Sequence, residues 1–153
     1  MLLWRLSGVQ HAEAFDGGYG LLFDGRWNTQ GHAVTYCATS PSLCVLEKLV
    51  HVEDPLLLPA LIMVTYEVPD DIAIEHVPLD DLPNDWRRQE GLTQQKGTDW
   101  HRSRTSPLLQ VPSAIVPLHN SPDMNLLINH THPSARSITI RALTPFTLDP
   151  RLF

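Results

Sequence analysis

The chain has 153 residues, of which 42% are hydrophobic and 18% are charged, and its formal net charge is −6. This composition is typical of one globular domain, residues 1–153, that is long enough to bury a core. The negative charge argues against a direct nucleic-acid site, because such sites are normally basic. No apolar run reaches membrane-spanning length, and the N-terminus lacks a basic segment followed by a signal core, so we expect a cytoplasmic protein.

The first residues predict a strand at Leu2–Leu6, followed by a short turn or helix at His11–Phe15. Three glycines then fall within Asp16–Gly20, and this density predicts a loop. The segment has no GxGxxG arrangement between a strand and a helix, so it does not indicate a Rossmann phosphate site. Two interpretations stay open: a flexible flank of a neighbouring pocket, or a connector whose glycines serve only turn geometry.

The stretch Gly25–His51 holds the greatest concentration of chemically useful side chains. Gly25 and Gly31 bracket the turn Arg26-Trp27-Asn28, and glycines at such points let the backbone approach a ligand closely. The run Ala33–Ala38 predicts a strand, because β-branched and aromatic residues dominate it.

A helix is predicted next, because Ser40 can cap it and Pro41 suits its first position, and we expect it to extend to about His51. Apolar residues cover nearly its whole circumference, which predicts a buried helix. Glu47 is the exception, since a carboxylate on a mostly apolar face is costly unless a cation, a proton or a ligand compensates it. Glu47 is therefore expected either to form a structural ion pair with an Arg or Lys or to belong to a functional site. We favour the functional site.

Beyond the central stretch, strands are predicted at Leu61–Val68 and Ile72–Val77, the second half-exposed. The segment Pro78–Pro107 is polar and is interrupted by proline and glycine. Within it we expect one short helix near Asp85–Gln89 and a second that begins at Trp100-His101. The cations of this segment are most simply a solvated face; they are Arg87, Arg88 and Lys96.

The last third predicts strands at Pro112–Leu118, Asn125–Ile128 and Ser137–Leu143, with Pro145–Phe153 as a tail lying across the sheet. Ser113 stands where the first of these strands begins. No GxSxG elbow accompanies it, so Ser113 taken alone is a structural hydrogen-bonding residue.

Cysteine and histidine often form redox or metal sites, but in this chain neither is spaced as such a site requires. Cys37 and Cys44 lack the CxxC spacing of a redox pair, so we expect both to be reduced core residues. The eight histidines contain one close pair, His130 and His132, but no HExxH sequence and no carboxylate at ligand spacing. We therefore expect no metal site.

The residues Gly25-Arg26-Trp27-Asn28, with Gly31, Tyr36, Ser40 and Glu47 at these spacings, resemble the RES domain, a family named for arginine, glutamate and serine. The serine of the name corresponds to Ser113, and Asn125–Asn129 fits the family's C-terminal pattern. The similarity extends from Trp4-Arg5 to about His132. It implies an α+β fold of the ADP-ribosyltransferase-like kind, with mixed or antiparallel β-sheets at its centre and helices on the flanks.

The resemblance also implies an enzyme whose substrate is NAD, cleaved between nicotinamide and ribose. That cleavage builds positive charge on the ribose, which Glu47 would stabilise. Arg26 would bind the pyrophosphate through two points, and Ser113 would hold the ribose or the amide. Tyr36 would stack on the nicotinamide or serve as a core tyrosine. Trp27 and Asn28 would support the pocket.

Members of this family act as toxins of bacterial toxin–antitoxin pairs, which implies a cognate antitoxin of the Xre, helix-turn-helix type that makes any DNA contact. Two alternatives are a protein ADP-ribosyltransferase that uses the same site and a non-catalytic binding module on the same fold. The sequence does not decide whether water, phosphate or a protein side chain accepts the ADP-ribosyl group. It also leaves the oligomeric state open, a homodimer within a larger toxin–antitoxin complex included.

Overall fold

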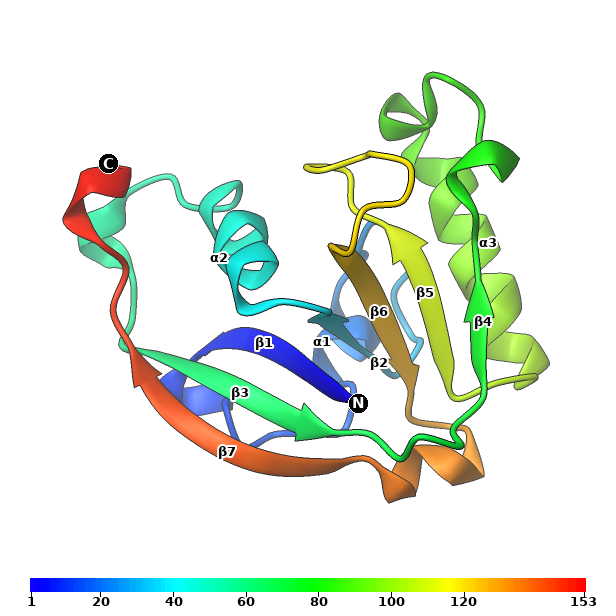
Figure 1. The fold of residues 1–153 in the computed structure, drawn as a ribbon, viewed down its shortest axis with the longest axis horizontal. Coiled ribbons are helices and arrows are strands. Elements are labelled where there is room, and N and C mark those ends of the chain that lie inside the picture. Colours follow the sequence, from blue (N-terminus) through cyan, green and yellow to red (C-terminus); the bar gives the residue numbers. More distant parts are fainter.

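The computed structural model describes the whole chain, residues 1–153, as one seven-stranded sheet with helices packed on it (Figure 1). The strands are β1 (Leu2–Gly8), β2 (Val34–Ala38), β3 (Leu61–Glu67), β4 (Ile74–His76), β5 (Leu108–Pro112), β6 (Met124–Asn129) and β7 (Thr139–Phe146). The α-helices are α1 (Gly18–Leu22), α2 (Pro41–Leu49) and α3 (Glu90–Ser103). None of these helices has the length and hydrophobicity needed to cross a membrane.

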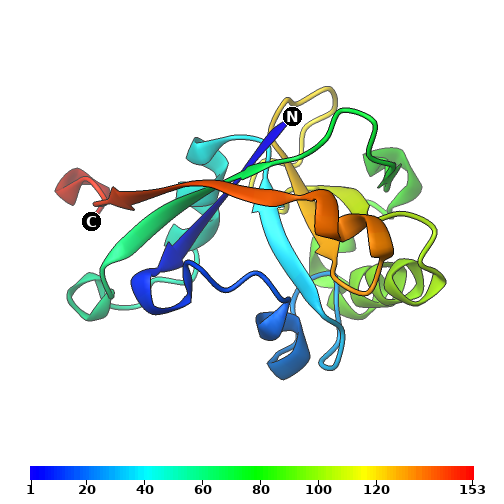
Figure 2. The same ribbon diagram turned by 90° about the horizontal axis from the view of Figure 1, so that it is seen from below.

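The sheet is mixed and has the spatial order β4-β5-β6-β2-β1-β3-β7. β4 and β5 are parallel, and the other neighbouring strands are antiparallel, which confirms the predicted α+β class. β1 and β2 pair at one register position, Trp4 opposite Ala38. Two halves of the sheet diverge from this junction (Figures 1 and 2), with α2 beside the junction and α3 beside β4 and β5.

Side chains of β2 alternate between the two faces of the sheet, as the twofold period of a strand requires. Val34 and Tyr36 pack in an apolar cluster under α3 that also contains three tryptophans, Trp27, Trp86 and Trp100. Cys37 packs in a second cluster on the opposite face. A third cluster fills the space between α2 and the half of the sheet formed by β1 and β3.

The start of α2 confirms the prediction made from its capping residues. The Ser40 hydroxyl accepts a hydrogen bond of 3.2 Å from the Leu43 N–H, and Pro41 occupies the first helical position. The hydroxyl thereby satisfies one of the backbone donors that a helix start leaves unpaired. The helix ends at Leu49, two residues before the predicted limit.

The prediction that α2 is buried on all sides is wrong. Within the helix only Leu43 and Cys44 are buried, whereas Leu46 is 40% exposed and Val50, the residue after its end, is 60% exposed. The sheet covers one face of the helix and nothing in the chain covers the other. Cys44 and Cys37 are free buried thiols, as predicted.

The largest departure from the sequence prediction is α3, which begins at Glu90 rather than at Trp100. Two glycines inside it, Gly91 and Gly97, had suggested breaks. Gly97 is needed for packing, because a β-carbon there would collide with the Trp27 carbonyl oxygen. The contact between helix and loop therefore overrides the low helix propensity of glycine.

The strand predicted at Pro112–Leu118 also lies elsewhere, since β5 occupies Leu108–Pro112. Ser113 therefore follows a strand instead of beginning one. The glycine-rich segment predicted as a loop contains the short helix α1, which begins after Gly17, a residue with φ of 74°. Glycine adopts this left-handed conformation without the steric cost that other residues incur.

Candidate active site

The loop that carries Arg26 is held by Tyr36 of β2. The Tyr36 hydroxyl accepts a hydrogen bond of 3.0 Å from the Trp27 N–H and donates one of 2.7 Å to Asn28 Oδ1. Burial raises the pKa of the Tyr36 hydroxyl well above its ordinary value, so it stays protonated and able to donate. Gly25 is required beside it, because a β-carbon at that position would lie 2.6 Å from the hydroxyl oxygen.

Helix α3 supports the same loop from the other side. Thr93 Oγ1 donates to the Arg26 carbonyl at 2.5 Å, and Gln94 Nε2 donates to the Gly25 carbonyl at 3.0 Å. Trp27 and Asn28 of this loop are buried. These bonds fix the backbone from which the Arg26 side chain projects.

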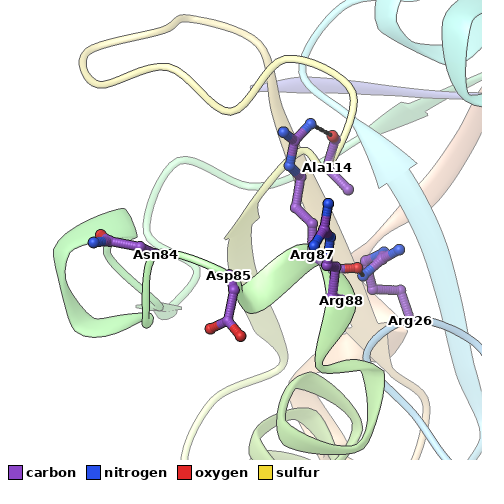
Figure 3. Close-up of a pocket in the computed structure, with 6 residues that line it drawn as sticks. All are labelled: Arg26, Asn84, Asp85, Arg87, Arg88 and Ala114. Carbon is purple, nitrogen blue, oxygen red and sulfur yellow. Dashed lines mark hydrogen bonds between the residues drawn. The ribbon is translucent and has the colours of Figure 1, made fainter.

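The Arg26 side chain borders a cavity of about 480 Å³ (Figure 3). Its Nη1 donates to the Arg87 carbonyl at 3.2 Å, and its Cζ lies 5.9 Å from the centre of the Trp86 ring. Five further residues line this cavity: Asn84, Asp85, Arg87, Arg88 and Ala114. Figure 3 shows the three arginines grouped on one side of it.

This grouping adds to the interpretation of Arg87 and Arg88 as a solvated face, which their exposure confirms. Both are exposed, but both line the cavity beside Arg26. Arg87 Nη1 also donates to the Ala114 carbonyl at 3.2 Å. A cavity with three guanidinium groups and one carboxylate is positive, although the chain as a whole is negative.

Glu47 projects from α2 and is half-buried. Its Oε1 accepts hydrogen bonds from Ser113 Oγ at 3.1 Å and from Asn125 Nδ2 at 2.6 Å. It forms no salt bridge with Arg or Lys, so the structural ion pair weighed from the sequence is absent. The polar neighbours of this carboxylate are neutral donors, and Oε2 accepts no hydrogen bond from the chain.

Ser113 connects Glu47 to the arginine-lined cavity. Its hydroxyl oxygen accepts from the N–H groups of Ile115 and Val116, at 3.0 and 3.2 Å, and its hydrogen is donated to Glu47. A hydroxyl has one hydrogen and two lone pairs, and in this structure the protein itself uses all three. The next residue in the chain, Ala114, lines the cavity, whereas Glu47 and Ser113 are not among its lining residues.

The structure thus brings the Arg26 loop, Tyr36 and the pair Glu47 and Ser113 to one face of the sheet. The hydroxyl of Tyr36 is occupied within the loop and its ring packs against the cluster under α3, so its structural role has direct support. Sequence reasoning did not assign a role to Asn125 or to α3. The amide of Asn125 next to three apolar residues, and its place in the family's C-terminal pattern, were the signals for the first. No group of three or more metal-ligating side chains gathers anywhere in the chain.

Comparison with known proteins adds to this geometry. Residues 2–149 match the model of the RES domain. The chain is 39% identical to a protein of Pseudomonas putida named Toxin Res, with 100% of both chains covered, and 36% identical to a Toxin Res of Yersinia enterocolitica, with 99% of both covered. It is 33% identical to the Prs ADP-ribosylating toxin of a Sphingobium species, with 97% of this chain and 94% of the relative covered.

A solved structure, the MbcT–MbcA toxin–antitoxin complex of M. tuberculosis, contains a chain that superposes on this one with a TM-score of 0.66. The sequence identity is 20%, over 95% of this chain and 84% of that chain. This similarity confirms the fold expected from the sequence, an α+β fold of the ADP-ribosyltransferase-like kind.

Proposed function

The chain belongs to the RES domain family, and from this premise we propose that it is the toxin of a bacterial toxin–antitoxin pair that consumes NAD. The reaction is cleavage of the bond between nicotinamide and ribose. The observation that supports the proposal is a carboxylate with one free oxygen, Glu47, whose hydrogen-bond partner Ser113 directly precedes Ala114, a lining residue of the cavity that holds three arginines.

Cleavage of the bond between nicotinamide and ribose is helped by such a carboxylate. When the bond breaks, its electron pair goes to the pyridinium nitrogen, and nicotinamide leaves as a neutral molecule without needing a proton. Positive charge then develops on the ribose, as in other glycosidic cleavages. A fixed negative group under the ribose stabilises that charge more in the transition state than in the ground state. Glu47, without a cationic partner to neutralise it, is suited to this role.

The arginine-lined cavity suits the other end of the substrate. NAD carries a diphosphate, and guanidinium groups recognise phosphate oxygens through paired hydrogen bonds. Arg26 is already oriented by the Arg87 carbonyl and the Trp86 ring, so little side-chain freedom is lost when the ligand binds. The cavity of about 480 Å³ lies within the usual size of small-molecule sites, about 300–1,000 Å³.

The acceptor of the ADP-ribosyl group distinguishes two versions of this function. With water or phosphate as acceptor, a new bond forms at the ribose carbon, the acceptor loses a proton, and NAD is degraded. With a protein side chain as acceptor, the same step modifies a target. The Sphingobium relative is named an ADP-ribosylating toxin, which supports transfer to a protein as the second candidate function. A non-catalytic binding module is the third candidate.

A toxin of this kind needs a partner that keeps it inactive. The structural relative was solved as a toxin–antitoxin complex, which supports a cognate antitoxin for this chain. The family resemblance suggests that the antitoxin is of the Xre type and carries the DNA contact. The net charge of −6 agrees with a chain that does not contact DNA itself.

The test is to incubate the purified chain with NAD and to separate the products by chromatography. Nicotinamide with ADP-ribose indicates hydrolysis, and a phosphorylated ADP-ribose formed only in phosphate buffer indicates phosphorolysis. Labelled protein after incubation with a cell extract and radioactive NAD indicates transfer. The Glu47→Gln variant serves as the control for contaminating activity. Intact NAD in both buffers together with no labelled protein in the extract would contradict both enzymatic versions and favour the binding module.

A further inference from the structure

Two donors occupy one oxygen of the Glu47 carboxylate. Asn125 Nδ2 lies 2.6 Å from Oε1 and Ser113 Oγ lies 3.1 Å from the same atom. A carboxylate oxygen accepts about two hydrogen bonds, so Oε1 is saturated within the protein. The other oxygen, Oε2, accepts none from the chain, and it is therefore the atom available to a substrate.

We propose that Asn125 is a positioning residue that holds the Glu47 carboxylate with Oε2 facing the substrate, and that Oε2 is the oxygen that stabilises the ribose charge. This inference rests on the proposed function. It assigns to Asn125 a role through Glu47 and no contact with NAD. Its shorter hydrogen bond makes Asn125 the principal donor of the pair.

The position of Asn125 suits this task. It lies in β6, opposite Ala38 of β2 on one side and Val111 of β5 on the other. A residue paired on both sides in the middle of a sheet has little backbone freedom, whereas Glu47 has three rotatable side-chain bonds. Sites supported by strands and helices are held more accurately than sites on loops. Asn125 thus transfers the rigidity of the sheet to the end of a flexible side chain.

The chemistry of the Asn125 side-chain amide also suits the positioning role. The Nδ2 group donates to the carboxylate without adding charge, so Glu47 keeps its full negative charge for the transition state. A Lys or Arg in this place would form an ion pair with Glu47 and oppose the attraction to the ribose. Ser113 alone would leave the carboxylate held by one bond, free to rotate about it.

The first measurement compares Asn125→Ala with the unaltered chain in steady-state NAD cleavage. We expect kcat to fall about 10²-fold, the effect of misplacing a catalytic group by about 1 Å, while the dissociation constant of NAD changes less than about threefold. Gln95→Ala, an exposed residue of α3, is the matched control and should keep both values. Weakened NAD binding with an unchanged kcat would overturn the proposal, because Asn125 would then contact the substrate.

Asn125→Asp is a second variant, nearly identical in shape, that replaces the donor with an acceptor. It should lower kcat at least as much as Asn125→Ala, because its carboxylate repels Glu47. The double variant Glu47→Gln/Asn125→Ala completes the test. A residue that acts only through Glu47 causes no further loss in the Glu47→Gln background. An independent, multiplicative loss there would contradict the positioning role.

A measurement without turnover separates this inference from the proposed function. In a ¹⁵N-labelled sample, the side-chain amide signal of Asn125 is identified by its loss in Asn125→Ala. We expect this signal to move in Glu47→Gln, because its acceptor changes from a carboxylate to an amide. An unmoved signal would overturn the hydrogen bond itself. If the unaltered chain does not cleave NAD, the proposed function fails, whatever the amide signal shows.

Discussion

At the scale of single residues, the contacts of Arg26 make a specific prediction for Arg26→Lys. Lysine keeps the positive charge but loses the planar fork and the packing over the Trp86 ring. One lost charge-assisted hydrogen bond is worth about 1.5 kcal/mol or more, so we expect the KM for NAD to rise about tenfold. Arg102→Lys, an exposed position of α3, is the control. An unchanged KM for Arg26→Lys would mean that Arg26 does not bind the diphosphate.

Glu47→Gln separates catalysis from stability. Glutamine has nearly the same shape, and its carbonyl oxygen can still accept from Ser113 and Asn125. No ion pair is lost, because Glu47 has none. We expect NAD cleavage to fall by about 10²–10³-fold or more, as when a transition-state charge loses its partner, with Tm nearly unchanged. Normal turnover would rule out the assignment, and a large fall in Tm would show that Glu47 serves mainly the fold.

His130 makes the free energy of unfolding depend on pH. Burial lowers the pKa of His130 from 6.5 to about 4, so the native imidazole is neutral between these values while the unfolded one is protonated. The unfolded state therefore binds more protons at this residue in this window, and the contribution of His130 to stability rises with pH from about 4 to 6.5. In His130→Gln, which can still meet the Thr35 hydroxyl, the rise should be smaller. Urea unfolding of both proteins across this pH range measures the difference, and equal slopes would contradict the buried neutral histidine.

At the scale of elements, α3 depends on the absence of a side chain at Gly97. Alanine there collides with the Trp27 carbonyl oxygen, and overpacking of this kind costs about 1–3 kcal/mol. The loop that carries Arg26 should shift as well, so the KM for NAD rises. Gly91→Ala in the same helix meets no atom within 4 Å and should stabilise the protein by about 0.5–1 kcal/mol. Thermal unfolding of the two variants measures the contrast, and a Gly97→Ala protein as stable as Gly91→Ala would refute the contact.

The comparison of α2 with α3 shows which elements local sequence determines. α2 has its own signals, a capping serine followed by proline, and both act within the first turn. α3 has no side-chain cap and contains two glycines, so its stability comes from Trp100 and from its hydrogen bonds to a loop more than sixty residues earlier. Such long-range contacts cannot be read from a sequence window, and for this reason β5 was also misplaced.

The residues of the candidate site also fall into two groups: those that local sequence predicts and those that only tertiary structure brings in. Arg26, Tyr36 and Glu47 lie within one stretch of sequence, where a polar turn, a strand and a helix with one carboxylate predict a site. Ser113 could be associated with them only through the family resemblance. Asn125, Arg87 and Arg88 join the site through tertiary structure, because β6 and the segment before α3 reach it from other parts of the chain.

At the scale of the whole molecule, the candidate site combines segments between Gly25 and Asn125 that lie far apart in the sequence, so its activity should report on folding as a unit. An enzyme that destroys a shared cofactor is harmful even at modest turnover. We therefore expect expression of this chain alone in a bacterial cell to lower cellular NAD and to arrest growth. Co-expression with the cognate antitoxin should restore both, because a partner that covers Arg26 and Glu47 would inactivate the enzyme without changing its fold.

The experiment pairs growth curves with an NAD assay in four strains, which express the unaltered chain, the chain with its antitoxin, Glu47→Gln, and Gly91→Ala. NAD should fall in the first and fourth strains only, because Gly91→Ala leaves the site intact and controls for substitution as such. Growth arrest in the Glu47→Gln strain would show that toxicity does not need the carboxylate. If the unaltered chain arrests growth while NAD is unchanged, ADP-ribosylation of a protein target becomes the favoured function. Modification of a single target consumes too little NAD to change the NAD concentration in the cell.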